Sequence, residues 1–149
     1  MKPVKTCILV ADGAHARVYL NDGPGHGISE MKEYAKDIDL NASRDINADK
    51  PGRSFDSGGE GRHAMEPPTD AKRHAKGEFA RGLAEKINTA MTAGEFDRLV
   101  LVAAPVTLGD LRQHLSKHAS DNIHGEIAKD LTHANNKDLL AQLGSVLAV

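Results

Sequence analysis

Two runs of apolar residues, Thr6–Ala11 and Leu99–Pro105, constrain the fold of this sequence more than any other feature. In each run the apolar residues are consecutive rather than alternating, so a strand built from either run must be covered on both faces. Such strands lie in the centre of a sheet that has helices on both sides. The sequence therefore predicts two neighbouring central strands, parallel to each other, in an α/β domain.

The other segments predict further strands and helices around this centre. The short connection Gly13–His15 requires the next strand to pair antiparallel with the first. Asp70 is a suitable N-cap for a long amphipathic helix, which we expect to stop at Gly94. The remaining expected elements are strands over Ala16–Asn21, Ile28–Tyr34 and Ile123–Ala128, and helices over Leu108–Leu115 and Leu139–Val146.

This order of elements predicts a ribonuclease H-like architecture of three layers, α/β/α. Two requirements apply: the crossovers must be right-handed and the two apolar strands must be central. A five-stranded mixed sheet of order 3-2-1-4-5, in which strand 2 is antiparallel, meets both requirements. A doubly wound nucleotide-binding fold is the alternative, but it needs helices after the first two strands, where the connections are too short. Because 149 residues are a typical length for one domain, we expect a single domain over residues 1–149.

The composition limits which classes of function and which cellular compartment are expected. The net charge of −2 gives no general attraction to nucleic acid, and 3% aromatic residues disfavour a base-stacking surface. The single cysteine, Cys7, lies in an apolar run, so we expect a buried, unreactive thiol and a cytoplasmic protein without disulfides. The apolar stretch around it is too short for a signal peptide or a membrane span, so no membrane contact is expected.

Residues 37–69 show neither helical nor strand periodicity and are rich in Asn, Asp, Gly, Ser, Pro and Arg. Connections of this length without secondary structure are uncommon inside compact domains and are usually either functional or disordered. The sequence leaves these two alternatives open. The residues of this loop that we expect to contact a ligand are Arg53, Gly58, Gly59, Arg62 and His63.

Basic residues also begin the long helix. Lys72, Arg73 and Lys76 are expected to overhang the end of the sheet and, with the arginines of the loop, to form a shallow site for phosphate or nucleic acid. Basic side chains at a core edge often simply extend into solvent, so a solvated rim is the alternative. Arg73 and Lys76 complete the set of predicted binding residues.

A metal-dependent nuclease of this fold needs carboxylates at the carboxyl ends of the central strands, where they hold two magnesium ions. Asp12 is in the right place for one of them, and Asp110, Asp130 and Asp138 could approach the same end. The simpler interpretation is that Asp12 ends its strand and accepts hydrogen bonds from the tight turn after it.

No cofactor and no resident metal are expected. His114 and His118 are spaced i, i+4 on one expected helix, but no acidic or cysteine partner is placed to complete a tetrahedral ligand set. Because the chain has eight histidines, such pairs are expected by chance.

Segments in three places resemble the bacterial host-attachment proteins. They are Ile8–Tyr19, then Ala103–Pro105 with Leu108–Arg112, and Ile127–Thr132. The segments lie in order, so the resemblance spans nearly the whole chain. It implies a role in attachment to host cells. Because the sequence offers no secreted or surface-anchored adhesin, we expect that role to be indirect.

The same layout is more remotely similar to the central domain of the archaeal and eukaryotic peptide release factors and of Pelota, itself ribonuclease H-like. In release factors a Gly-Gly-Gln tip, between the third strand and the long helix, promotes hydrolysis of peptidyl-tRNA. The corresponding loop here carries Gly58-Gly59-Glu60. A carboxylate at Glu60 would be repelled by the negative charge of tRNA, so we do not expect peptide release by this chain alone.

The favoured hypothesis is a non-enzymatic binding domain whose long loop contacts RNA, a ribosomal surface or a protein partner. The alternative is a hydrolase, either a divergent metal-dependent nuclease that uses Asp12 or a peptidyl-tRNA esterase that uses the loop with Glu60. Exposed sheet edges would also permit a homodimer.

Overall fold

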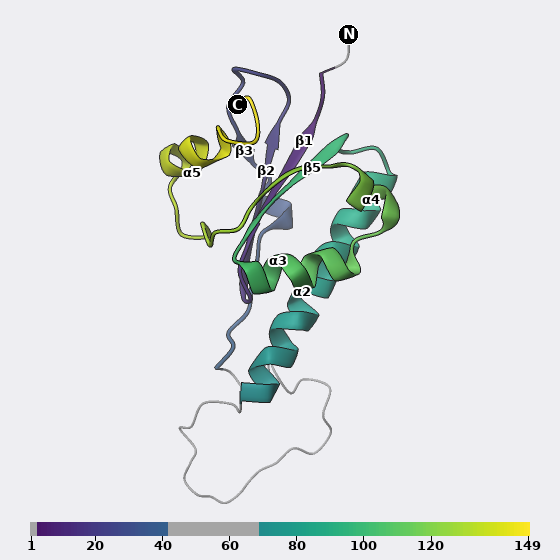
Figure 1. The fold of residues 1–149 in the computed structure, drawn as a ribbon, viewed down its shortest axis with the longest axis vertical. Coiled ribbons are helices and arrows are strands. Elements are labelled where there is room, and N and C mark those ends of the chain that lie inside the picture. The colour runs from purple at the N-terminus through teal and green to yellow at the C-terminus, as the bar shows by residue number, and fades with distance from the viewer. Residues whose placement is uncertain (1–2, 42–68) are drawn as a thin grey trace, which may run out of the picture.

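The computed structural model describes residues 3–41 and 69–149, which form a mixed α/β fold around one sheet (Figure 1). The strands are β1 (Thr6–Ala11), β2 (His15–Asn21), β3 (Ser29–Glu30), β4 (Lys36–Asp37), β5 (Arg98–Ala103) and β6 (Ile123–Ile127). The helices are the 3-10 helix η1 (Lys32–Tyr34), α2 (Thr69–Thr92), α3 (Pro105–His114), α4 (Lys117–Asp121) and α5 (Asn136–Leu143). None of these helices is long and apolar enough to cross a membrane.

The centre of the sheet is the parallel pair β1 and β5. The strand order is β3-β2-β1-β5-β6, and β4 also pairs with β2. Every residue of β1 is buried, and so is every residue of β5 except Arg98. β2 runs antiparallel to β1, with Thr6 opposite Asn21. The predicted central pair and the predicted antiparallel strand are confirmed, because a run that is apolar throughout is most stable as a strand covered on both faces.

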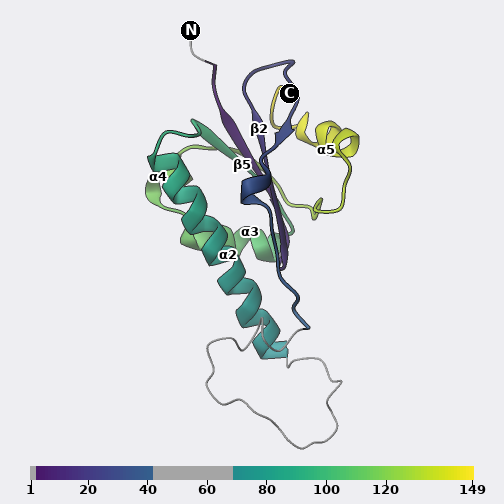
Figure 2. The same cartoon turned by 180° about the vertical axis from the view of Figure 1, so that it is seen from behind.

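Helices cover both faces of the sheet, and β1 contributes to a separate core on each. Cys7 and Leu9 pack with α2, α3 and α4, whereas Ile8 and Val10 pack with α5. Figures 1 and 2 show α5 on one side of the sheet and the other three α-helices on the opposite side. Alternate residues of a strand point to opposite faces, which is why β1 is apolar at every position. Cys7 is fully buried, as predicted, and burial raises the pKa of its thiol.

The predicted third strand is where the structure departs most from expectation. Instead of one strand over Ile28–Tyr34, the chain forms β3, η1 and β4, so the sheet has six strands rather than five. The physical reason is Tyr34, which is 8% exposed and donates its hydroxyl proton to Glu95 at 2.7 Å. Burying this aromatic ring at the edge of the core stabilises the 3-10 turn more than a polar edge strand would gain from continuous pairing.

Two details of the helices also differ. Asp70 lies inside the first turn of α2 and is not its N-cap, contrary to the prediction. After α3 the chain begins a separate helix, α4, because the Ser116 hydroxyl accepts a hydrogen bond from the Ala119 N–H at 3.1 Å and caps it. His114 and His118 therefore lie on different helices, and the prediction of i, i+4 spacing on one helix is wrong.

Gly125 of β6 packs closely against the segment that follows α5. A Cβ atom at Gly125 would lie 2.8 Å from the Cβ of Val146, which is attached to the backbone and cannot rotate away. We expect Gly125→Ala to lower the free energy of unfolding by about 1–3 kcal/mol in urea denaturation. Gly109→Ala in α3 is the control, because a Cβ there meets nothing within 4 Å and should raise stability by up to about 1 kcal/mol. Equal stability of the two variants would contradict this packing.

Candidate functional site

The carboxyl end of β1 carries a tight turn that Asp12 organises. Asp12 Oδ1 accepts hydrogen bonds from the backbone N–H groups of Ala14 and His15, each at 2.7 Å. The backbone N–H of Asp12 donates to the carbonyl of His15 at 2.9 Å. A turn this short leaves backbone N–H groups without partners in a strand, and the carboxylate accepts hydrogen bonds from them. The turn role predicted for Asp12 is confirmed.

The same carboxylate gathers polar side chains from distant parts of the chain. His15 Nδ1 lies 3.1 Å from each carboxylate oxygen of Asp12, and the His133 ring meets the His15 ring edge-on, with centroids 5.4 Å apart. The Thr132 hydroxyl lies 3.2 Å from Asp12 Oδ2 and 2.6 Å from Asp130 Oδ1. Because a hydroxyl has one proton, Thr132 can donate to only one of these carboxylates at a time. We call Asp12, His15 and His133 the Asp12 cluster.

The ligand atoms of the Asp12 cluster lie close to one another. One oxygen or nitrogen atom from each of the three residues lies within 4.8 Å of the other two. Asp12 and His15 are partly buried and His133 is exposed, so solvent reaches the cluster. In residues 3–41 and 69–149 this is the one group of three or more histidine, cysteine or acidic residues arranged in this way.

Hydrogen bonds keep Asp12 in its ionised form. Burial is the largest influence and on its own raises the pKa of the carboxyl, because it disfavours the charged state. Hydrogen bonds from the Ala14 N–H, the His15 ring and the His15 N–H together outweigh burial, so the pKa of Asp12 lies below its ordinary value. At neutral pH, Asp12 is therefore a carboxylate whose oxygens can accept a proton donor or a cation.

Two of the predicted binding residues lie on α2. Lys76 packs onto the turn after β1, because a Cβ added at Gly13 would lie 2.6 Å from Lys76 Cγ. The absence of a side chain at Gly13 thus lets α2 lie against the turn. Arg73 forms an ion pair with Asp110 of α3, and its side chain is nevertheless 47% exposed. Arg73 therefore joins two helices besides presenting charge to solvent.

Of the other residues predicted for a site, some are described by the structure and the rest lie outside the described residues. Asp110 pairs with the arginine of α2, and Asp138 lies in the first turn of α5, so neither belongs to the Asp12 cluster. Asp130 approaches Asp12 through the Thr132 hydroxyl. The residues outside the described part of the chain are Arg53, Gly58, Gly59, Glu60, Arg62 and His63.

Three residues of this site were not expected from the sequence: His15, His133 and Thr132. Asp12 and Thr132 are 120 positions apart, and no local periodicity connects them. The signal that could have found them is topological. β1, β5 and β6 are parallel neighbours, so the segments that follow their carboxyl ends emerge at the same edge of the sheet.

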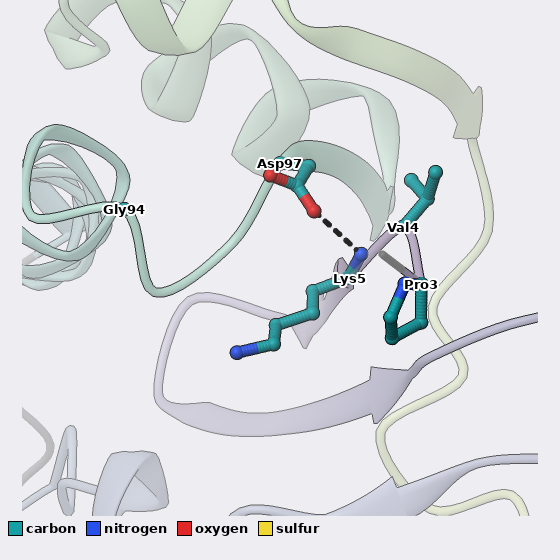
Figure 3. A pocket seen from close by; sticks show the side chains of 5 residues that line it. All are labelled: Pro3, Val4, Lys5, Gly94 and Asp97. Carbon is teal, nitrogen blue, oxygen red and sulfur yellow. Dashed lines mark hydrogen bonds between the residues drawn. The ribbon is translucent and has the colours of Figure 1, made fainter. Parts of the chain in front are cut away.

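A hollow of about 500 Å³ lies at the opposite end of the sheet, where β1 and β5 begin (Figure 3). It is lined by Pro3, Val4, Lys5, Gly94 and Asp97. The carboxylate of Asp97 already accepts a hydrogen bond from the backbone N–H of Lys5 at 2.8 Å. Binding sites usually combine an apolar cavity with several converging polar groups, and this hollow lacks that combination. The Asp12 cluster is therefore the stronger candidate site.

The family described as "Protein required for attachment to host cells" has a model that matches residues 7–143. The chain belongs to this host-attachment family. The matched range includes the turn after β1 and the connection between β6 and α5, so the whole Asp12 cluster lies within the family region. No curated protein is similar enough in sequence to be matched to this host-attachment protein.

A solved structure described as an archaeal protein resembles the host-attachment protein in fold. The TM-score is 0.54, the sequence identity is 11%, and the match covers 97% of this chain and 35% of the archaeal one. The host-attachment protein thus spans about a third of the length of that protein. At this identity the likeness shows the fold alone, because one fold serves many activities.

Proposed function

We propose that this host-attachment protein is a cytoplasmic, non-enzymatic binding domain that contacts RNA at the end of the sheet where α2 begins. The observation that carries the proposal is the position of α2. Its first turns extend beyond the sheet, and its first buried residue is Ala75, well after the start of the helix at Thr69 (Figure 1). Within the described part of the chain, Thr69, Asp70, Arg73 and His74 at the start of this helix are exposed.

Basic residues at this end favour RNA as the partner. Lys72, Arg73 and Lys76 lie in the first turns of α2, and Arg73 is 47% exposed although it pairs with Asp110. Arg53 and Arg62 precede this helix in the sequence and lie outside the described residues. Arginine binds phosphate through paired N–H donors, and the start of a helix adds a partial positive charge. RNA recognition that relies on backbone phosphates does not need the aromatic residues that this chain lacks.

The remote similarity to release-factor central domains favours ribosomal RNA as the RNA that this domain contacts. The strand order β3-β2-β1-β5-β6 is compatible with the ribonuclease H-like architecture of those domains, which we propose for this chain. The contribution to host attachment would then be indirect and would act through the synthesis of other proteins.

A metal-dependent hydrolase has weaker support. Two-metal phosphoryl chemistry uses several carboxylates to clamp both ions, whereas the Asp12 cluster contributes one. We expect the purified protein with magnesium to leave RNA and peptidyl-tRNA intact. Cleavage of either substrate, lost on Asp12→Asn, would instead favour the nuclease or the esterase.

Sedimentation of cell lysate on sucrose gradients, with and without ribonuclease, tests the RNA proposal. We expect the wild type to migrate with ribosomal particles until ribonuclease is added, because phosphate contacts dominate such binding. An Arg53→Ala/Arg62→Ala variant is expected to move to the top of the gradient. Migration of the wild type at the top in every condition would overturn the proposal.

The matched control for this experiment is Arg81→Ala/Lys117→Ala. It removes the same charge from positions on the middle of α2 and on α4, where each side chain pairs with a nearby acid of its own helix. We expect this variant to migrate like the wild type, and equal loss by both variants would contradict a binding site that needs Arg53 and Arg62 in particular. Light scattering of the purified proteins tests the further expectation that exposed sheet edges join two copies.

A further inference from the structure

We propose that Asp12, His15 and His133 bind a zinc ion or a chemically similar first-row transition metal ion. The ligands come from the turn between β1 and β2 and from the connection between β6 and α5. The proposal does not rest on RNA binding, because none of its ligands is a basic residue at the start of α2, although Lys76 of that helix packs onto the same turn. Two imidazoles and one carboxylate form a common ligand set for such ions.

The distances within the cluster fit one shared ion. Two ligand atoms that each lie about 2.0–2.2 Å from a zinc ion are roughly 3–3.5 Å apart. His15 Nδ1 lies 3.1 Å from each oxygen of Asp12, which is this separation, and the ion would take the place of the proton that His15 Nδ1 shares with Asp12 in the metal-free protein. His133 is exposed and its ligand atom lies within 4.8 Å of the other two, so rotation of its side chain can complete the set.

Neighbouring groups already orient the carboxylate. Two backbone N–H groups of the turn hold Asp12 Oδ1, and the Thr132 hydroxyl faces Asp12 Oδ2 at 3.2 Å. Supporting hydrogen bonds of this kind are typical around metal ligands, because they hold the ligand in place and tune its charge. Since Thr132 directly precedes His133, the same contact brings the second histidine to the turn.

The chemistry of the ligands favours zinc over magnesium. Magnesium prefers oxygen ligands in octahedral geometry, whereas imidazole suits zinc, copper, iron and nickel. Three protein ligands leave one position of a tetrahedral zinc ion for solvent, and the exposure of His133 gives solvent access to it. The site would therefore be an open one, able to accept an exchangeable ligand in addition to the protein.

A bound ion would also have a structural effect. It would join the turn after β1 to the connection before α5, two segments 120 positions apart at the Asp12–Thr132 contact. An ion that binds the folded chain in preference to the unfolded chain raises the melting temperature. Zinc is therefore expected to stabilise the protein against heat.

Calorimetric titration of the full, chelator-treated chain with zinc chloride tests the site. We expect one zinc ion per chain for the wild type. His133→Ala should lower the zinc affinity by at least about tenfold, because replacing even a residue that only supports a metal ligand typically lowers the affinity by that factor. His118→Ala is the control, since His118 is exposed on α4 and lies outside the cluster. It should bind zinc like the wild type.

Thermal unfolding with and without zinc gives a second readout. Zinc should raise the melting temperature of the wild type and of His118→Ala, and much less that of His133→Ala. His133 is exposed, so its replacement should leave the metal-free melting temperature unchanged. Equal zinc affinity of the wild type and His133→Ala, no zinc binding by the wild type, or displacement of zinc by magnesium would each overturn the proposal.

Discussion

Leu139→Ala is expected to lower the free energy of unfolding by about 3 kcal/mol, inside the range of roughly 2–5 kcal/mol found for buried leucines. Leu139 is 1% exposed and belongs to the core cluster that contains Ile8 and Val10 of β1. Among the described residues, α5 is the one α-helix on that face of the sheet (Figure 2). The cavity left by alanine would therefore not be filled by a second helix. Urea denaturation followed by circular dichroism measures the loss.

Leu140→Ala is the matched control, because it makes the same chemical change one position along α5. Leu140 is only partly buried, so we expect its replacement by alanine to lower the free energy of unfolding by less than about 1.5 kcal/mol. The difference between the two variants reports which side of α5 faces the sheet. Equal losses at the two positions would contradict the orientation of α5 seen in the structure.

Asn21→Asp is expected to destabilise the fold by about 3 kcal/mol at neutral pH, although the two side chains have nearly the same shape. Asn21 is 1% exposed and its amide donates to the carbonyls of Gly23 and Gly27, at 3.0 and 2.7 Å. A carboxylate cannot donate a proton, so it would face two carbonyl oxygens in a buried site. Urea denaturation at neutral and at acidic pH measures both the size and the sign of the effect.

The pH dependence makes this prediction specific. Burial raises the pKa of the introduced carboxyl in the folded state above its unfolded value, because it disfavours the charge. The loss of stability should therefore be smallest in acid, grow as the pH rises from the unfolded pKa to the folded pKa, and level off above the folded pKa. Asn136→Asp, at the exposed start of α5, adds the same charge and should be neutral or slightly stabilising. A loss for Asn21→Asp that is independent of pH would contradict the buried hydrogen bonds.

Local patterns made several elements predictable from the sequence. A strand that is apolar at every position, such as Thr6–Ala11, is stable only with both faces covered, and β1 and β5 confirm this. Phe79, Leu83 and Ile87 recur at helical spacing, and all three are buried residues of α2. The turn role of Asp12 was also predictable, since its hydrogen-bond partners in the turn, Ala14 and His15, lie only two and three residues further along the chain.

Only the tertiary structure decided the edge of the sheet and the composition of the Asp12 cluster. The segment over Ile28–Tyr34 forms one short strand and a 3-10 turn, followed by β4, because Tyr34 reaches Glu95 beyond the end of α2. His133 joins Asp12 because β1 and β6 are parallel strands of one sheet, with β5 between them. The sequence by itself determines contacts between near neighbours, through burial and turn chemistry. Contacts between distant residues depend on the path of the chain, and no residue pattern encodes that path locally.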